Sequence, residues 1–202
     1  MQTRLPTETR QLEITAAALR LASEFSPALI TTAQIAGQVG ISQGAVFRHF
    51  PSKDAIWHAA MRRVHAELLG AVEAAAQGAP SPLEALRAMF KAHVGYVATH
   101  PGVPRFIFHE MQSAQDTPVK QEVRTLLHAY RMRLLGLLDD AAQRGGLRAG
   151  LDHDAAATLF VGAVQGLIMQ SMAAGRANAL RAQADAVFTI YLLGIRAGRG
   201  NA

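Results

Sequence analysis

The placement of glycine and proline most constrains this chain of 202 residues, because these helix-breaking residues stand in clusters rather than being scattered. Between the clusters, apolar residues recur at helical spacing: Ile14, Ala18, Leu21 and Phe25 fall on one face of a segment over residues 8–25. Almost no stretch alternates between apolar and polar residues, as a half-buried strand would. The pattern predicts an all-α protein of about nine helices.

The breaks give the expected helix ranges. They are residues 8–25, 32–39, a short helix from 43 that ends before Phe50, and then 53–76, 82–99, 104–112, 118–144, 153–174 and 178–197. The uncharged run over residues 155–175 is long enough to cross a membrane. Its many Ala, Gly and polar residues instead predict a buried helix of a soluble protein.

Composition narrows the classes of function. The chain has no cysteine, which excludes disulfides, thiolate metal sites and cysteine nucleophiles. Its formal net charge of +5 permits an anionic partner without requiring one. The first ten residues lack the apolar segment of a signal peptide, which predicts a cytoplasmic protein.

The densest turn and cap signals lie between residues 31 and 52. Thr31 followed by Gln34 is the pattern of a capping box, Gly40 can close the first short helix in a left-handed conformation, and Ser42 can cap a second helix. Two short helices joined by a tight turn that contains glycine form the geometry that places a second helix in the major groove of DNA. The pattern therefore predicts a helix-turn-helix.

Side chains around the second short helix suit contacts with DNA. Arg48 can form a bidentate contact with guanine, and Gln43 can address adenine or a phosphate. Thr32 and Ser42 stand at helix N-termini, which favour phosphate. The expected DNA-binding residues are Thr32, Ser42, Gln43, Gly44, Ala45, Phe47, Arg48, His49 and Lys53. A helical hairpin without a role in DNA binding has the same spacing, so spacing alone leaves that alternative open.

Residues 30–36 (ITTAQIA) and 39–54 (VGISQGAVFRHFPSKD) resemble the DNA-binding signature of the TetR family of bacterial transcriptional regulators. The resemblance implies a three-helix DNA-binding domain over residues 1–52 and an effector-binding and dimerisation domain over residues 53–202. It also implies a homodimer, most often a repressor, that binds a palindromic operator in double-stranded DNA. Two positions depart from the family: Phe47 stands where Tyr is usual, and Pro51 where Lys or a polar residue is frequent.

The second half of the chain predicts a pocket and an interface. Met, aromatic and His residues between the fourth and eighth helices suit a hydrophobic or aromatic effector. The candidates are Trp57, Met61, His65, Met89, His93, Tyr96, Phe106, His109, His128, Met132, Gln165 and Met169. Small residues in the helices at 153–174 and 178–197 predict close helix contacts, which the resemblance assigns to the homodimer. An interior helix of a monomer is the alternative.

No pattern in the chain predicts catalysis or a cofactor. The HExxH, P-loop and GxGxxG motifs are absent, and no two His residues have the i, i+4 spacing of a metal site on one helix. The sequence therefore predicts a ligand-responsive DNA-binding regulator that is not an enzyme. A helical adaptor or a small-molecule-binding protein that does not bind DNA is the alternative.

Overall fold

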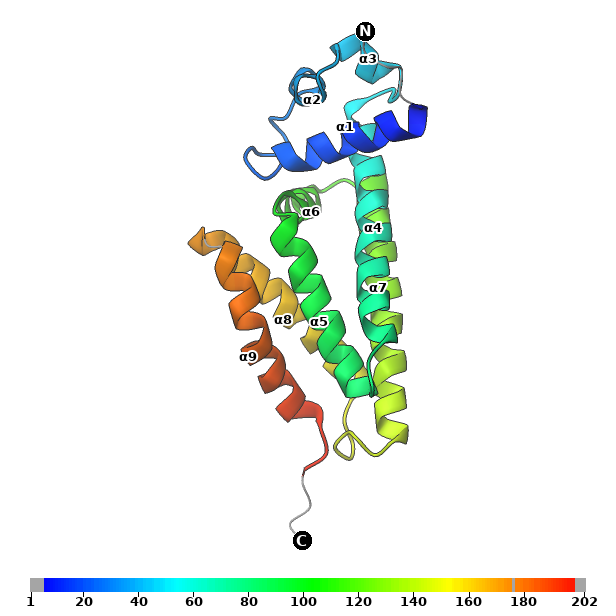
Figure 1. Cartoon of the computed structure of the whole chain (residues 1–202), viewed down its shortest axis with the longest axis vertical. Coiled ribbons are helices and arrows are strands. Elements are labelled where there is room, and N and C mark those ends of the chain that lie inside the picture. Colours follow the sequence, from blue (N-terminus) through cyan, green and yellow to red (C-terminus); the bar gives the residue numbers. More distant parts are fainter. Residues whose placement is uncertain (1–5, 176, 199–202) are drawn as a thin grey trace. The chain divides into compact units, whose positions relative to one another are not determined.

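The computed structural model describes residues 6–175 and 177–198, and within these ranges it contains nine α-helices and no strand, as predicted (Figure 1). The helices are α1 (Thr7–Leu21), α2 (Thr32–Val39), α3 (Gln43–Phe47), α4 (Lys53–Gln77), α5 (Pro82–Thr99), α6 (Gly102–Gln112), α7 (Pro118–Gln143), α8 (His153–Ala174) and α9 (Ala177–Ile195). Within the described ranges, one antiparallel bridge pairs Leu147 with Arg196.

Three helix ends differ from the prediction by two residues or more, including that of α9, which ends at Ile195 rather than at residue 197, and several others differ by one. The first helix ends at Leu21 rather than Phe25, because residues 23–25 form turns that bond back to the carbonyls of Arg20 and Leu21. The sixth helix begins at Gly102 rather than Pro104, since the Val103 amide already donates to the His100 carbonyl. Gly102 is buried at this helix start.

The chain divides into two compact units. Unit 1 comprises residues 1–66 and 100–125, and unit 2 comprises residues 67–99 and 126–202. The domain boundary predicted after residue 52 therefore does not coincide with the boundary between the two compact units. Unit 1 also contains the first part of α4 and all of α6. The helices α4 and α7 each contribute residues to both units.

The core of unit 1 brings α6 together with the N-terminal helices. Buried apolar residues line the inner faces of α1, α2, α4 and α6, among them Ile14, Ile35, Ile56 and Phe106. The rings of Trp57 on α4 and Phe106 on α6 stack with their centroids 4.6 Å apart. The helix α6 is therefore part of the same packed body as the helix-turn-helix.

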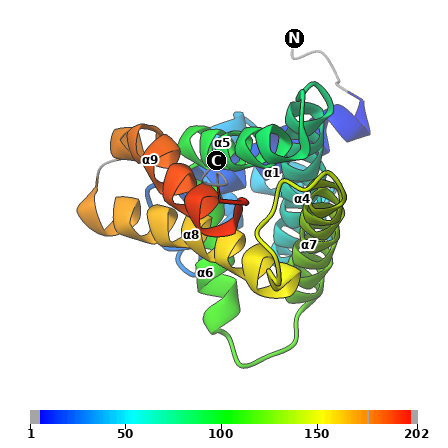
Figure 2. The same ribbon diagram turned by 90° about the horizontal axis from the view of Figure 1, so that it is seen from below.

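Unit 2 is built around aromatic side chains from three helices. The helices α5, α8 and α9 pack on one another, as Figure 2 shows. Phe160 of α8 is fully buried and meets Phe90 of α5 and Tyr191 of α9 edge to face, with ring centroids 5.3 and 5.5 Å apart. Such edge-to-face pairs are favourable because the positive edge of one ring meets the negative face of the next.

The apolar helix α8 is buried on one face only. Among the described helices it is the one long and apolar enough to cross a membrane by length and composition. Phe160, Val164 and Leu167 are buried inside unit 2, whereas Leu159 is 59% exposed and Met169 is 50% exposed. Within the monomer, therefore, only the inner face of α8 is buried as predicted, and its outer face is exposed.

Candidate nucleic-acid interface

The local sequence builds the helix-turn-helix as predicted. The Thr31 hydroxyl accepts from the Gln34 amide at 3.2 Å, while the Gln34 side chain accepts from the Thr31 amide at 2.8 Å, so the capping box is complete. Gly40 has φ of +74°, the left-handed conformation that favours glycine. The Ser42 hydroxyl accepts from the Ala45 amide at 3.2 Å and caps α3.

The packing of α2 against α3 fixes which side chains of α3 face outward. Ile35 and Val46 are fully buried between the helices of unit 1. On the opposite side, Gln43, Gly44 and Arg48 are exposed, and the Phe47 ring is 47% exposed. The Arg48 guanidinium has no hydrogen-bond or ion-pair partner among the described residues, so its donors are available to a ligand.

Two residues expected to face DNA lie inside instead. Ala45 is only 9% exposed, so it lies on the inner face of α3, and its predicted place on the outer face is wrong. Thr32 is 8% exposed, and its hydroxyl accepts a hydrogen bond of 2.7 Å from the Gln43 side chain. This bond ties the start of α3 to the start of α2 and positions Gln43 at the surface.

The backbone of His49 and the side chain of Lys53 both make contacts within unit 1. The His49 carbonyl accepts from the Gln11 side chain at 3.1 Å, and the ring atom Nδ1 is buried without a partner. The Lys53 ammonium donates to the Ala28 carbonyl at 3.0 Å, and partial burial lowers the pKa of this group. Lys53 therefore braces the loop before α2.

Contacts with α6 and α7 complete unit 1. Gly102 at the start of α6 lies against the backbone of α1 so closely that an added Cβ atom would meet the Leu19 carbonyl oxygen at 1.9 Å. The His65 ring of α4 is hydrogen-bonded to the Glu122 carboxylate of α7. These contacts join the predicted DNA-binding helices to segments later in the chain.

The predicted effector residues divide between the two units. In unit 1, Trp57, Met61 and Phe106 are buried, His65 is partly buried, and His109 is exposed. In unit 2, Met89, His93 and Tyr96 of α5 face the interior to differing degrees.

Four other candidates in unit 2 lie on its surface: His128, Met132, Gln165 and Met169. The helical phase explains the difference. The inner face of α7 in unit 2 carries Tyr130, Leu134 and Leu138, and that of α8 carries Phe160, Val164 and Leu167. The four candidates were chosen by residue type, and the helical phase places them on the outer faces of α7 and α8.

Tyr130 was not among the effector candidates predicted from the sequence. It is buried, and its hydroxyl lies 3.3 Å from Nδ1 of His93. Burial lowers the pKa of His93 to about 4 and raises that of Tyr130, so both groups are neutral at physiological pH. Nearby on α5, the Tyr96 hydroxyl donates to the Glu67 carboxylate at 3.0 Å. The spacing of Tyr130 from Leu134 and Leu138 places it on the apolar stripe of α7 and could have identified it.

Comparison with protein families gives two matches. Residues 14–60 match the family model of bacterial regulatory proteins of the tetR family, and residues 79–190 match that of the tetracyclin repressor-like C-terminal domain. Among curated relatives, the nucleoid occlusion factor SlmA of Aliivibrio fischeri is 24% identical over 146 residues, which cover 72% of this chain and 74% of the relative.

Solved structures share the fold over nearly the full length. The transcriptional regulator FadR of Bacillus subtilis, solved with stearoyl-CoA, has 20% identity and a TM-score of 0.79, over 91% of this chain and 98% of that chain. SmeT, the repressor of a multidrug efflux pump of Stenotrophomonas maltophilia, has 21% identity and a TM-score of 0.75, over 96% and 93% of the two chains.

Proposed function

Because the chain belongs to the TetR family of bacterial regulatory proteins and is a ligand-responsive DNA-binding transcriptional regulator, we propose that it is a cytoplasmic repressor. It binds a palindromic operator as a homodimer, and binding of a hydrophobic or aromatic effector causes it to dissociate from the operator. No catalytic step is part of this function.

The exposed face of α3 carries the proposal for DNA. Arg48 has free donors next to the surface residues Gln43 and Gly44, and the glycine leaves room for a close approach to base edges. Phe47 offers an apolar ring to a thymine methyl group rather than the hydroxyl that a tyrosine would offer to a phosphate. Arg48 reads guanine, and Gln43, held by Thr32, addresses a neighbouring base or phosphate.

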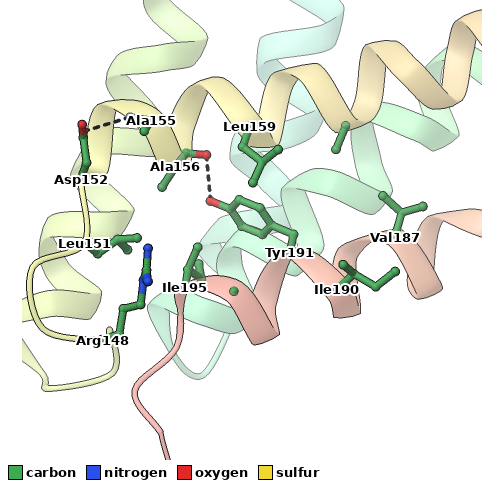
Figure 3. A pocket seen from close by; sticks show the side chains of 12 residues that line it. Arg148, Leu151, Asp152, Ala155, Ala156, Leu159, Val187, Ile190, Tyr191 and Ile195 are labelled. Carbon is green, nitrogen blue, oxygen red and sulfur yellow. Dashed lines mark hydrogen bonds between the residues drawn. The ribbon is translucent and has the colours of Figure 1, made fainter.

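The outer faces of α8 and α9 support the homodimer. Leu159 of α8 and Ile190 and Leu193 of α9 are 59%, 71% and 56% exposed in the monomer. Leu159 and Ile190 line an apolar groove between the two helices (Figure 3). Apolar side chains grouped on one surface of a soluble protein are typical of an interface. A two-fold dimer through these helices presents two α3 helices and so requires an operator with matching symmetry.

Release by the effector requires that the ligand prefers one conformation of the dimer. The inward residues Met89, His93, Tyr96 and Tyr130 of unit 2 supply apolar surface for an uncharged effector, and the buried His93 and Tyr130 are neutral hydrogen-bonding groups. The helix α4 runs unbroken from Lys53 to Gln77 and contributes residues to both units. The effector therefore acts on DNA binding through α4.

The proposal is tested by measuring binding of the full chain to DNA upstream of its own gene and to random DNA at two salt concentrations. We expect selective binding that weakens with salt, because phosphate contacts release counterions. Arg48→Ala should lose about 1–3 kcal/mol of discrimination between the two DNAs. Arg124→Ala, which removes an exposed arginine of α7 paired with Asp116, is the matched control and should bind like the native protein.

Selective binding that is the same in Arg48→Ala would move base reading to Gln43. If the upstream DNA is not preferred, sequences are selected from a random pool. Failure to prefer any selected sequence over random DNA would contradict the proposed repressor and favour a helical adaptor.

A further inference from the structure

The side chain of Gln43, at the start of α3, is exposed but is held by a hydrogen bond within unit 1. Its amide nitrogen donates to the Thr32 hydroxyl at 2.7 Å. Thr32 is the first residue of α2 and is 8% exposed, so the packed helix holds the acceptor in place. The bond therefore orients the Gln43 amide before any DNA is bound.

The groups that Gln43 has left for a ligand follow from the chemistry of its amide. A primary amide has one acceptor oxygen and two hydrogens on its nitrogen. Thr32 accepts one of these hydrogens, which leaves Oε1 and the second hydrogen. Gln43 therefore offers an acceptor and a donor side by side.

An acceptor beside a donor matches one base in the major groove. Adenine presents the donor N6 beside the acceptor N7, so both bonds of Gln43 can form at once. Guanine presents two acceptors at the same edge, and its O6 would face Oε1 without a hydrogen between them. A phosphate offers acceptors only, so it would also leave Oε1 without a donor.

We propose that Thr32 is a positioning residue that makes Gln43 read an adenine in each half-site of the operator, an inference that rests on the DNA-binding function proposed above. Oε1 accepts from N6 of the adenine, and the second amide hydrogen is donated to N7. Because the side chain is already ordered, it loses less conformational freedom when it meets the base. Thr32 acts through Gln43 and lies below the surface that meets DNA.

The helix also gives the place of this adenine in the half-site. Arg48 follows Gln43 by five residues and keeps helical backbone angles, so the two positions differ by a rise of about 7.5 Å. Successive nucleotides of a DNA strand are about 3.4 Å apart along the helix axis. For a recognition helix that lies in the major groove, the adenine is therefore about two base pairs from the guanine that Arg48 contacts.

Reading the amino group makes binding sensitive to its methylation. In a duplex, one N6 hydrogen of adenine pairs with thymine, and the other faces the major groove, where Oε1 of Gln43 accepts it. A methyl group on N6 replaces this second hydrogen, because the first is needed for pairing. We therefore expect N6-methylation of this adenine to weaken binding of the regulator.

The test measures binding of the full chain to operator duplexes by fluorescence anisotropy. DNA selected with the native protein and with Gln43→Ala first locates the position, which is the one whose base preference the variant relaxes. The duplexes then carry adenine, N6-methyladenine or purine there; purine lacks the amino group. The native protein should bind adenine about 2–12-fold more tightly than purine in each half-site, the contribution of one hydrogen bond. It should bind N6-methyladenine no better than purine, whereas Gln43→Ala should bind all three duplexes alike.

Variants of Thr32 separate positioning from folding. Thr32→Val keeps the shape of the side chain and removes the acceptor, so its preference for adenine over purine should fall to less than half of the native value. Thr32→Ser keeps the hydroxyl and should keep the native preference. Thr125→Val removes an exposed hydroxyl of α7 that donates to the Gln121 carbonyl, and this matched control should bind like the native protein. Circular dichroism should show the same helix content for all of these variants.

Three results would overturn the inference. Gln43→Ala could relax a position that is not adenine, it could weaken binding to all sequences alike, as loss of a phosphate contact would, or Thr32→Val could keep the native preference for adenine. Each of these leaves the proposed regulator intact, because the native protein still selects an operator. Failure of the native protein to select any sequence would instead contradict the regulator itself, and this inference with it.

Discussion

Replacing Gly102 by alanine should lower the free energy of unfolding by about 2–3 kcal/mol. The added Cβ atom would lie 1.9 Å from the Leu19 carbonyl oxygen and 2.9 Å from the Ser23 nitrogen. Both are backbone atoms of the α1 end, so no side-chain rotation relieves the overlap, and α6 must move away from α1. Denaturant unfolding monitored by circular dichroism gives the value, and fluorescence of Trp57 reports loss of the stack on Phe106.

Gly37→Ala is the matched control in the same unit. Gly37 lies inside α2, and a Cβ atom there meets no atom within 4 Å. Because alanine favours helix over glycine, this variant should be unchanged or more stable by up to about 1 kcal/mol. If Gly102→Ala were as stable as Gly37→Ala, the close packing of α6 on α1 would be wrong.

Phe160→Ala should cost about 3–5 kcal/mol of stability. The Phe160 ring is fully buried in unit 2 and lies edge to face against Phe90, Phe188 and Tyr191. Truncation removes this contact surface and leaves a cavity that rigid aromatic neighbours cannot fill. The measurement is the midpoint of denaturant unfolding at constant slope, compared with the native protein.

Two further variants serve as controls for Phe160→Ala. Leu127→Ala removes an apolar side chain that is 42% exposed on α7 and should change stability by less than about 0.5 kcal/mol. Phe160→Leu keeps most of the volume and should recover part of the loss. A cost for Phe160→Ala no greater than that for Leu127→Ala would show that the aromatic cluster is not the core of unit 2.

Most of the helix-turn-helix could be predicted because its helix ends are determined by local capping and turn residues. The Thr31 capping box, the left-handed Gly40 and the Ser42 cap depend on residues within three or four positions of one another, and each is present as expected. Such signals act through backbone groups that must be satisfied at every helix end. The positions of the short helices α2 and α3 follow from them directly.

The direction in which side chains point was less predictable. Ala45 faces inward, and the Thr32 hydroxyl accepts a hydrogen bond from the Gln43 side chain. The helix α3 is only five residues long, so its orientation is determined by packing on α2. For the effector candidates, Met132 and Met169 were chosen by type and lie on outer faces. Tyr130 was not selected, although its spacing from Leu134 and Leu138 places it on the buried face of α7.

The association of α6 with the N-terminal helices could not be predicted from local patterns at all. It depends on Gly102 meeting Leu19 and on Phe106 stacking on Trp57, which are contacts between residues far apart in the sequence. A glycine beside Pro101 indicates a turn at the sequence level, and only the packed structure reveals the close approach. The extent of unit 1 therefore exceeds the predicted boundary after residue 52.

Selection of bound sequences from a pool of random double-stranded DNA tests the central claim most directly. The account predicts enrichment of one inverted repeat whose half-sites each contain a guanine contacted by Arg48, with half-site centres one helical turn or a multiple of it apart. Selection with Arg48→Ala should return the same symmetry with the preference at that guanine relaxed. Rounds of selection that enrich no sequence, or that enrich one without two-fold symmetry, would contradict a homodimeric repressor that reads its operator through α3.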